Sequence, residues 1–197
     1  IGDEDYPSPA VVTAIPPGRV LDLTARLRPD GRLDWTPPRG DWTVLRFGWS
    51  LTGRMNNPAE PEATGLEVDK YDPAAVRRYI DHHLAMYQDA VGGELSSKGI
   101  QALVTDSWEA GAQNWTPAMR EEFRKRRGYD LLPWMPVLAG RVIGSSNASD
   151  RFLRDFRQTL KDMVADNHQK ILADAAHARG MTYYTEVQGD TPRAIAD

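Results

Sequence analysis

Two short stretches of the sequence hold the carboxylates best placed for acid–base chemistry. Asp106 and Glu109 follow the apolar run 100–105, and Glu186 lies in a second run, 181–187. Runs of this length and composition are typical of buried strands. In parallel α/β folds the functional side chains gather where the strands end. We therefore expect these carboxylates at the functional edge of a sheet.

The residues around Glu109 suit the recognition of a sugar. Trp108 lowers the local polarity, which disfavours the charged form of a neighbouring carboxylate and makes it a usable general acid. Aromatic rings also offer flat apolar platforms for sugar rings. The stretch 106–115 further contains Gln113, Asn114 and Trp115. A carboxylate after a strand equally suits a helix cap or a salt bridge, so position alone leaves both roles open for Glu109.

Four oxygen-bearing side chains between residues 56 and 69 offer ligands for a hard cation such as calcium. They are Asn56, Asn57, Glu67 and Asp69. Their spacing does not match a known calcium loop, so a solvated loop is the favoured interpretation. The four histidines lack the spaced partners of a metal site, and packing is the favoured role for His82, His83, His168 and His177.

The elements that must position these groups differ between the two halves of the chain. Residues 19–27 and 42–51 alternate between apolar and polar side chains, which is the pattern of half-buried strands. Pro29-Asp30-Gly31 lies between strand-like runs and predicts a hairpin turn. Residues 10–52 are therefore expected to form a small antiparallel β module.

Beyond residue 70 the apolar period becomes helical. Asp72-Pro73 predicts a helix start and Gly92-Gly93 its end. A short helix is expected from Thr116-Pro117 to Gly128, and a long one from its cap at Asp150 to Gly180. Helices that alternate with buried strands are typical of a parallel α/β fold.

The expected fold class is α/β. Two buried strands are too few to close a barrel of eight, so we expect a partial (β/α)8 TIM barrel preceded by the antiparallel β module. The predicted domains are residues 1–65, a β-rich module or barrel insertion, and 66–197, a partial barrel segment that carries the catalytic groups.

Composition narrows the classes of partner. The 197 residues are 41% hydrophobic, enough for a core, and carry a net charge of -4 without a basic stripe for nucleic acid. With no cysteine, disulfides and thiolate metal sites are excluded. No apolar run is long enough to span a membrane. The acidic start is not a signal peptide and lacks an initiator Met, so we expect a trimmed or processed chain.

Several longer segments resemble glycoside hydrolase family 106, in the same order along the chain. They are 40–48, 52–53 with 57–59, 65–70, 106–111 with 113–116, 121–123 with 126–130, and 151–153 with 155–157. The resemblance runs from about residue 20 to residue 190. A match across this many segments is more specific than any single short motif.

The resemblance implies an inverting α-L-rhamnosidase of bacterial plant-polysaccharide breakdown, built as a (β/α) barrel with attached β-rich domains. It implies a calcium ion at the active site, whose ligands it does not place here. Glu109 matches a catalytic glutamate of the family, and Glu186 resembles an active-site glutamate. The other catalytic carboxylate is expected beyond Asp197, on the remaining domains of a longer parent chain, so the isolated chain is expected to be inactive.

The resemblance further implies a rhamnose-containing glycan as substrate and a periplasmic or secreted location. The expected subsite residues are Asp106, Trp108, Asn114 and Trp115. Neither nucleic acid nor a membrane is an expected partner. Two alternatives stay open, namely a non-catalytic or degenerate carbohydrate-binding module, for which the Trp-rich β half would suit, and a purely structural fragment that aggregates.

Overall fold

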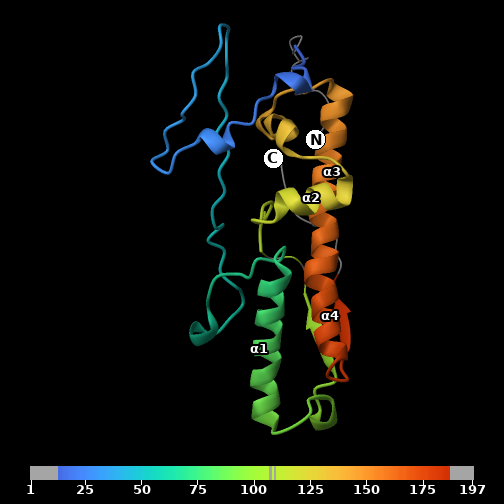
Figure 1. The fold of residues 1–197 in the computed structure, drawn as a ribbon. Coiled ribbons are helices and arrows are strands. Elements are labelled where there is room, and N and C mark those ends of the chain that lie inside the picture. Colours follow the sequence, from blue (N-terminus) through green and yellow to red (C-terminus); the bar gives the residue numbers. More distant parts are fainter. Residues whose placement is uncertain (1–12, 107, 109, 187–197) are drawn as a thin grey trace, which may run out of the picture.

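The computed structural model describes residues 13–106, 108 and 110–186, which form a mixed helix and strand fold (Figure 1). The helices are α1 (Pro73–Val91), α2 (Met119–Arg127), α3 (Ser146–Met163) and α4 (Lys170–His177), and the strands are β1 (Ala102–Thr105) and β2 (Thr182–Thr185). A π-helical turn, Val164–Gln169, joins α3 to α4, and a 3-10 segment covers Leu132–Ala139. The coarse α/β prediction is confirmed.

Local capping explains where α1 begins and ends. The Asp72 carboxylate accepts a hydrogen bond from the backbone N–H of Ala74 at 2.9 Å, and Pro73 occupies the first helical position. The helix stops at Gly92, whose φ of 66° is in the left-handed region that glycine adopts readily. The predicted boundaries of this helix are confirmed.

The other two helix starts differ from their predictions. The hydroxyl of Thr116 donates to Asp69 instead of capping, and α2 begins three residues later at Met119. The long helix begins at Ser146, before the predicted cap Asp150, because the Ser145 hydroxyl accepts the Ala148 N–H at 3.1 Å. Both shifts follow from which side-chain oxygen meets the free N–H groups of the first turn.

The two strands pair in parallel, with Ala102 opposite Thr182 and Thr105 opposite Thr185. Leu103 and Tyr183 pack against the helical side of this sheet, in a core made with α1 and α4. On the opposite face Val104 and Tyr184 are 66% and 60% exposed. One face of the sheet is therefore covered by helices and the other is open, and these two strands do not by themselves show a barrel.

The helical body has two apolar cores, which follow one another along the rod formed by α3, the π turn and α4 (Figure 1). The first core lies between α2, the 3-10 segment and α3, and includes Phe123, Phe152 and Phe156. The second lies between α1, α4 and the sheet. Burial of such side chains is the main stabilising contribution to the fold. Among the described helices none is sufficiently long and apolar to traverse a lipid bilayer.

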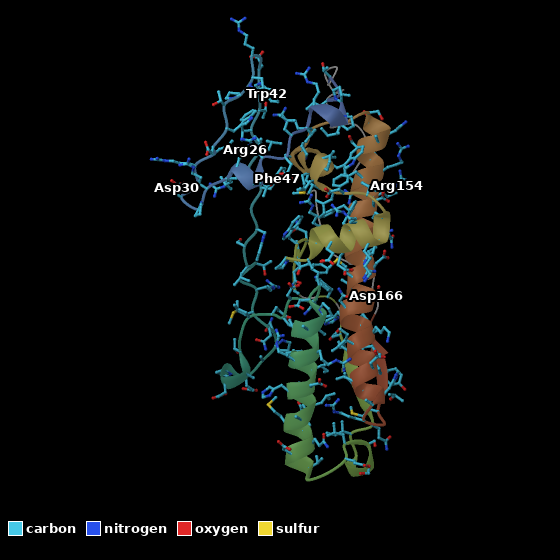
Figure 2. All side chains as sticks on the ribbon, in the orientation of Figure 1. Arg26, Asp30, Trp42, Phe47, Arg154 and Asp166 are labelled. Carbon is cyan, nitrogen blue, oxygen red and sulfur yellow. The ribbon has the colours of Figure 1, made fainter. Side chains whose placement is uncertain are left out.

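The predicted antiparallel β module is not present in the described part of residues 10–52. This segment is extended chain with short 3-10 turns. Around Trp42 it runs apart from the helices (Figure 2), whereas Ile15 and Val20 pack against the first core and Phe47 lines a hollow with Phe156. A single bridge pairs Leu27 with Leu33 around the predicted Asp30-Gly31 turn. Residues 35–53 make no backbone–backbone hydrogen bond to other described residues.

The apolar alternation predicted strands here, but the described residues contain no partner strand with which this segment pairs. Trp49 and Leu51 are 59% and 74% exposed. A strand needs the N–H and C=O groups of a partner strand as well as an alternating sequence. The sequence pattern is that of a strand, but the described chain supplies no neighbour for it.

Candidate functional site

The ends of the two strands bring two predicted site residues together. The backbone N–H of Glu186 donates to the carbonyl of Thr105 at 3.0 Å, which extends the ladder by one residue beyond β2. Asp106 and Glu186 thus follow paired positions on strands that are about 4.8 Å apart. Both side chains are exposed. The structure confirms that these two carboxylates share the edge of the sheet where both strands end.

A hydroxyl network ties this edge to the π turn. Tyr183 and Thr105 place their hydroxyl oxygens 2.8 Å apart across the sheet. The Tyr183 hydroxyl also donates to the side-chain carbonyl of Gln169, the last residue of the π turn. π turns are frequent at functional sites because they rotate side chains out of the regular helical positions. No pattern in the sequence predicted this turn.

Trp108 is held on several sides. Its indole N–H donates to the carbonyl of Gly111 at 2.7 Å, and its ring packs against the first core. The ammonium of Lys70 lies 5.6 Å from the ring centroid, within the range of a cation–π interaction. Trp108 is therefore anchored to Gly111, to Lys70 and to the first core. Glu109, the predicted catalytic residue beside it, lies outside the described residues.

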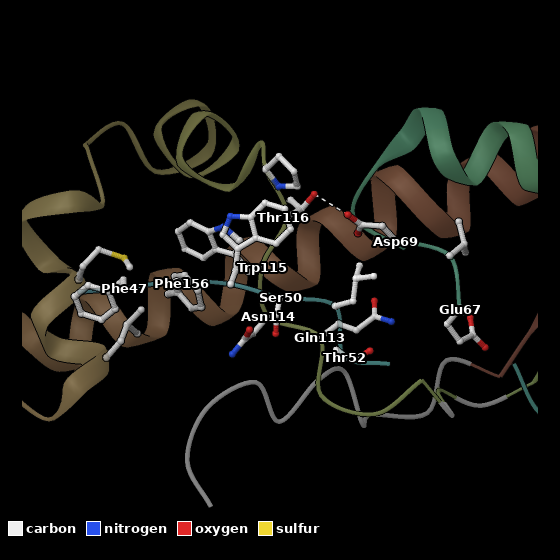
Figure 3. Close-up of a pocket in the computed structure, with 17 residues that line it drawn as sticks. Phe47, Ser50, Thr52, Glu67, Asp69, Gln113, Asn114, Trp115, Thr116 and Phe156 are labelled. Atoms are coloured by element: carbon white, nitrogen blue, oxygen red, sulfur yellow. Dashed lines mark hydrogen bonds between the residues drawn. The ribbon is translucent and has the colours of Figure 1, made fainter. Parts of the chain in front are cut away.

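The other two predicted subsite residues, Asn114 and Trp115, line a hollow of about 560 Å³ (Figure 3). Asn114 is exposed, whereas Trp115 is half-buried and packs partly against the first core. Phe47 and Phe156 line one end of the hollow, and Glu67 lies at the other. The wall therefore combines aromatic rings with amide and carboxylate groups, as binding pockets for small molecules do.

Three hydrogen bonds, one buried and two partly buried, position the wall of this hollow. The hydroxyl of Tyr71 donates to the backbone carbonyl of Gln113 at 2.5 Å. One oxygen of Asp69 accepts from the hydroxyl of Thr116 at 2.8 Å and the other from the N–H of Tyr71 at 2.9 Å. Burial, and secondarily the charge of Asp69, raise the pKa of Tyr71. The start of α1 is thereby fastened to the segment that carries Asn114 and Trp115.

Tyr71 and Lys70 were missed as candidates in the sequence, although they lie in or next to the segment 65–70 that carries the family resemblance. Their partners are distant in the chain: Gln113 is 42 residues from Tyr71. Local spacing contains no information on contacts between such distant residues. The one usable signal was that Lys70 and Tyr71 lie in or next to segment 65–70, whose polar residues had no other explanation.

The oxygen ligands suggested for calcium are used in other ways. Asn56 accepts the N–H of Gly65 at 2.7 Å and donates to Ala63 at 3.0 Å, which closes its own loop. Glu67 pairs with Lys70, whose ammonium lies 2.6 Å from its carboxylate. Across residues 13–106, 108 and 110–186, no three acidic or histidine side chains gather as a metal site would require. Asn56 and Glu67 are therefore engaged by neighbours within the chain, and the calcium ion implied by the resemblance stays an expectation.

His168 lies in the π turn, and its side chain is partly buried. Burial and the nearby charge of Lys70 lower the pKa of His168 to about 4, so its imidazole is neutral at neutral pH. The Nδ1 atom is buried and has no hydrogen-bond partner within the described part of the chain. The predicted packing role fits this burial.

Comparison with known proteins decides the family. A model of the alpha-L-rhamnosidase family, glycoside hydrolase family 106, matches residues 3–197. The chain belongs to glycoside hydrolase family 106. The resemblance noted in the sequence is thus confirmed, and with it the assignment to glycoside hydrolases.

Two individual proteins are similar to this family 106 chain. A rhamnosidase of known structure from Novosphingobium sp. PP1Y is 46% identical, with a TM-score of 0.76 over 89% of this chain and 17% of its own. A protein of Formosa agariphila named "Putative beta-glucuronidase" is 37% identical over 180 residues, which are 91% of this chain and 15% of the relative. The chain therefore spans about one-sixth of the length of either protein.

Proposed function

We propose that this chain supplies part of the active site of an inverting α-L-rhamnosidase that removes terminal rhamnose from plant polysaccharides or glycosides. The observation that carries the proposal is the family match over residues 3–197. The placement of Asp106 and Glu186 side by side at the strand ends supports it, because active sites of parallel α/β enzymes form there.

Inversion requires two carboxyl groups about 6.5–9.5 Å apart, one that protonates the leaving oxygen and one that activates a water. We assign the acid to Glu109, which follows the anchored Trp108. The second carboxylate is assigned to a later strand, beyond Asp197. Asp106 and Glu186 would bind sugar hydroxyls, since carboxylates accept the hydrogen bonds that hydroxyls donate. No step proposed here depends on calcium.

The same proposal gives the sheet a place in a (β/α)8 barrel. β1 and β2 are parallel neighbours with α1 and α4 packed on one face. In a barrel the helices form the outer ring, and the opposite face of each strand points to the interior. Val104 and Tyr184, now exposed, would then contact side chains from further strands. Secretion or a periplasmic location is proposed on the family resemblance alone.

The test is hydrolysis by the full-length protein of aryl α-L-rhamnosides, with aryl β-D-glucuronides as the comparison. We expect rhamnoside cleavage, and proton NMR during the first turnovers should show the β anomer of rhamnose forming first. If the protein prefers the glucuronide, its activity is instead the one for which the Formosa agariphila relative is named. Binding of rhamnosides without turnover would favour the non-catalytic carbohydrate-binding alternative.

A further inference from the structure

Lys70 is a charged side chain in an unusual place for a lysine. It lies two residues before the cap of α1, and its side chain is only 12% exposed. Its ammonium is 2.6 Å from the carboxylate of Glu67, itself 20% exposed. Lysine side chains are mostly exposed, and those that are fully buried are almost always paired. The pair therefore holds the ammonium at a defined position.

The fixed ammonium lies over the indole of Trp108, at 5.6 Å from the ring centroid. A cation in this position is attracted by the electron-rich face of the ring, and more strongly when water is excluded. The indole N–H is engaged by Gly111 at the same time. Trp108 is thus held by its face, its edge and the first core, and two of these contacts come from outside its own segment.

Among the groups around Lys70, its own ammonium is the cation that contacts Trp108. The imidazole of His168 is neutral at neutral pH, partly because Lys70 is close. The carboxylate of Asp69 is engaged by Thr116 and by the N–H of Tyr71. Glu67 is therefore the carboxylate that orients Lys70, and Lys70 in turn contacts Trp108.

We propose that Lys70 is a positioning residue, whose ammonium, oriented by Glu67, fixes the Trp108 indole. The inference rests on the proposed function, because the residue after Trp108 is Glu109, the assigned acid. Lys70 acts through Trp108 and need not touch the substrate. Misplacement of a reacting group by about 1 Å can lower a rate about 100-fold, so the effect should fall on the chemical step.

The experiment compares Lys70→Met and Lys70→Arg in the full-length protein with an aryl α-L-rhamnoside as substrate. Lys70→Met keeps most of the length of the side chain and removes the charge. We expect kcat to fall about 10- to 100-fold with KM nearly unchanged. Lys70→Arg should recover most of the loss, because a guanidinium also pairs with a carboxylate and lies over aromatic rings.

Lys170→Met is the matched control. Lys170 makes an ion pair of the same length, 2.6 Å to Asp174, but both side chains are well exposed. Its kcat and KM should equal those of the wild type, since exposed pairs contribute little. The kcat values are compared per folded molecule, with the folded fraction taken from circular dichroism. A kcat of Lys70→Met equal to that of the control would overturn the proposal. A rise in KM alone would also overturn it.

Two further measurements separate this proposal from its premise. If the wild-type protein does not cleave rhamnosides, the proposed function fails, and the anchor is then tested by thermal unfolding of Lys70→Met, Trp108→Leu and the double variant. Coupled residues should show losses of Tm that do not add, whereas additive losses would refute the contact. If Lys70→Met does not fold, Glu67→Gln replaces it, with a lower kcat expected and an unchanged kcat as the refuting result.

Discussion

Glu186 donates its backbone N–H to the carbonyl of Thr105 at 3.0 Å, one residue beyond the end of β2. This bond carries the parallel register past both strands, so Asp106 and Glu186 leave the sheet at the same level. Thr105 also places its hydroxyl 2.8 Å from that of Tyr183. The edge where the carboxylates lie is therefore held by backbone and side-chain bonds together.

Glu186→Gln in the full-length protein tests the role of this carboxylate. If Glu186 binds sugar hydroxyls in the ground state and the transition state alike, KM for an aryl rhamnoside should rise about 10-fold while kcat changes little. Steady-state kinetics measure both. The matched control is Glu121→Gln on the exposed side of α2, which should leave both constants unchanged. A variant in which kcat collapses at constant KM would instead make Glu186 a group of the chemical step.

Tyr71→Phe tests the bond that fastens the hollow to α1. The change removes the hydroxyl that donates to the Gln113 carbonyl at 2.5 Å and leaves that acceptor buried without it. We expect unfolding to become easier by about 1–3 kcal/mol, measured by urea denaturation. Tyr87→Phe is the control, because Tyr87 is 46% exposed and its change should be close to neutral. Equal effects of the two variants would contradict the assigned role.

His168 predicts how stability depends on pH. Because its pKa is about 4 in the folded protein against 6.5 unfolded, the unfolded chain binds the proton more readily. The contribution of the neutral imidazole is complete above pH 6.5 and is lost as the pH falls from there to 4. The expected loss between pH 7.5 and 4.5 is about 2 kcal/mol.

The measurement is urea unfolding at these two pH values. His168→Gln should remove this part of the pH dependence, since glutamine does not titrate. His177→Gln, at an exposed position of α4, should keep it. Identical pH profiles for wild type and His168→Gln would show that His168 does not titrate in this range.

The sequence was sufficient wherever structure is set locally. Asp72, Pro73 and Gly92 bound α1 because caps and left-handed glycines act within a few residues. The apolar runs gave both strands, and the rule for parallel strands put Asp106 and Glu186 at one edge. The family resemblance, which the comparison confirms, rested on segments of several residues rather than on one motif.

The sequence was insufficient where distant groups decide. Alternation in residues 42–51 predicted a strand, but a strand also requires a partner, and the described chain supplies none. The contacts of Trp108 with Lys70 and of Thr116 with Asp69 each join segments nearly 40 or more residues apart. These contacts, and the π turn that contacts the sheet, position the candidate site and cannot be seen in local spacing.

The most direct test of the account is the leaving-group dependence of Glu109→Gln in the full-length protein, with Glu121→Gln as the control. A general acid is needed least by the best leaving groups. We predict near wild-type kcat/KM on aryl rhamnosides that have very good leaving groups, and a fall of about 100-fold or more on those that have poor ones. An equal loss on every substrate would make Glu109 the base instead of the acid. Wild-type rates on every substrate would contradict the claim that this chain carries a catalytic carboxylate of a rhamnosidase.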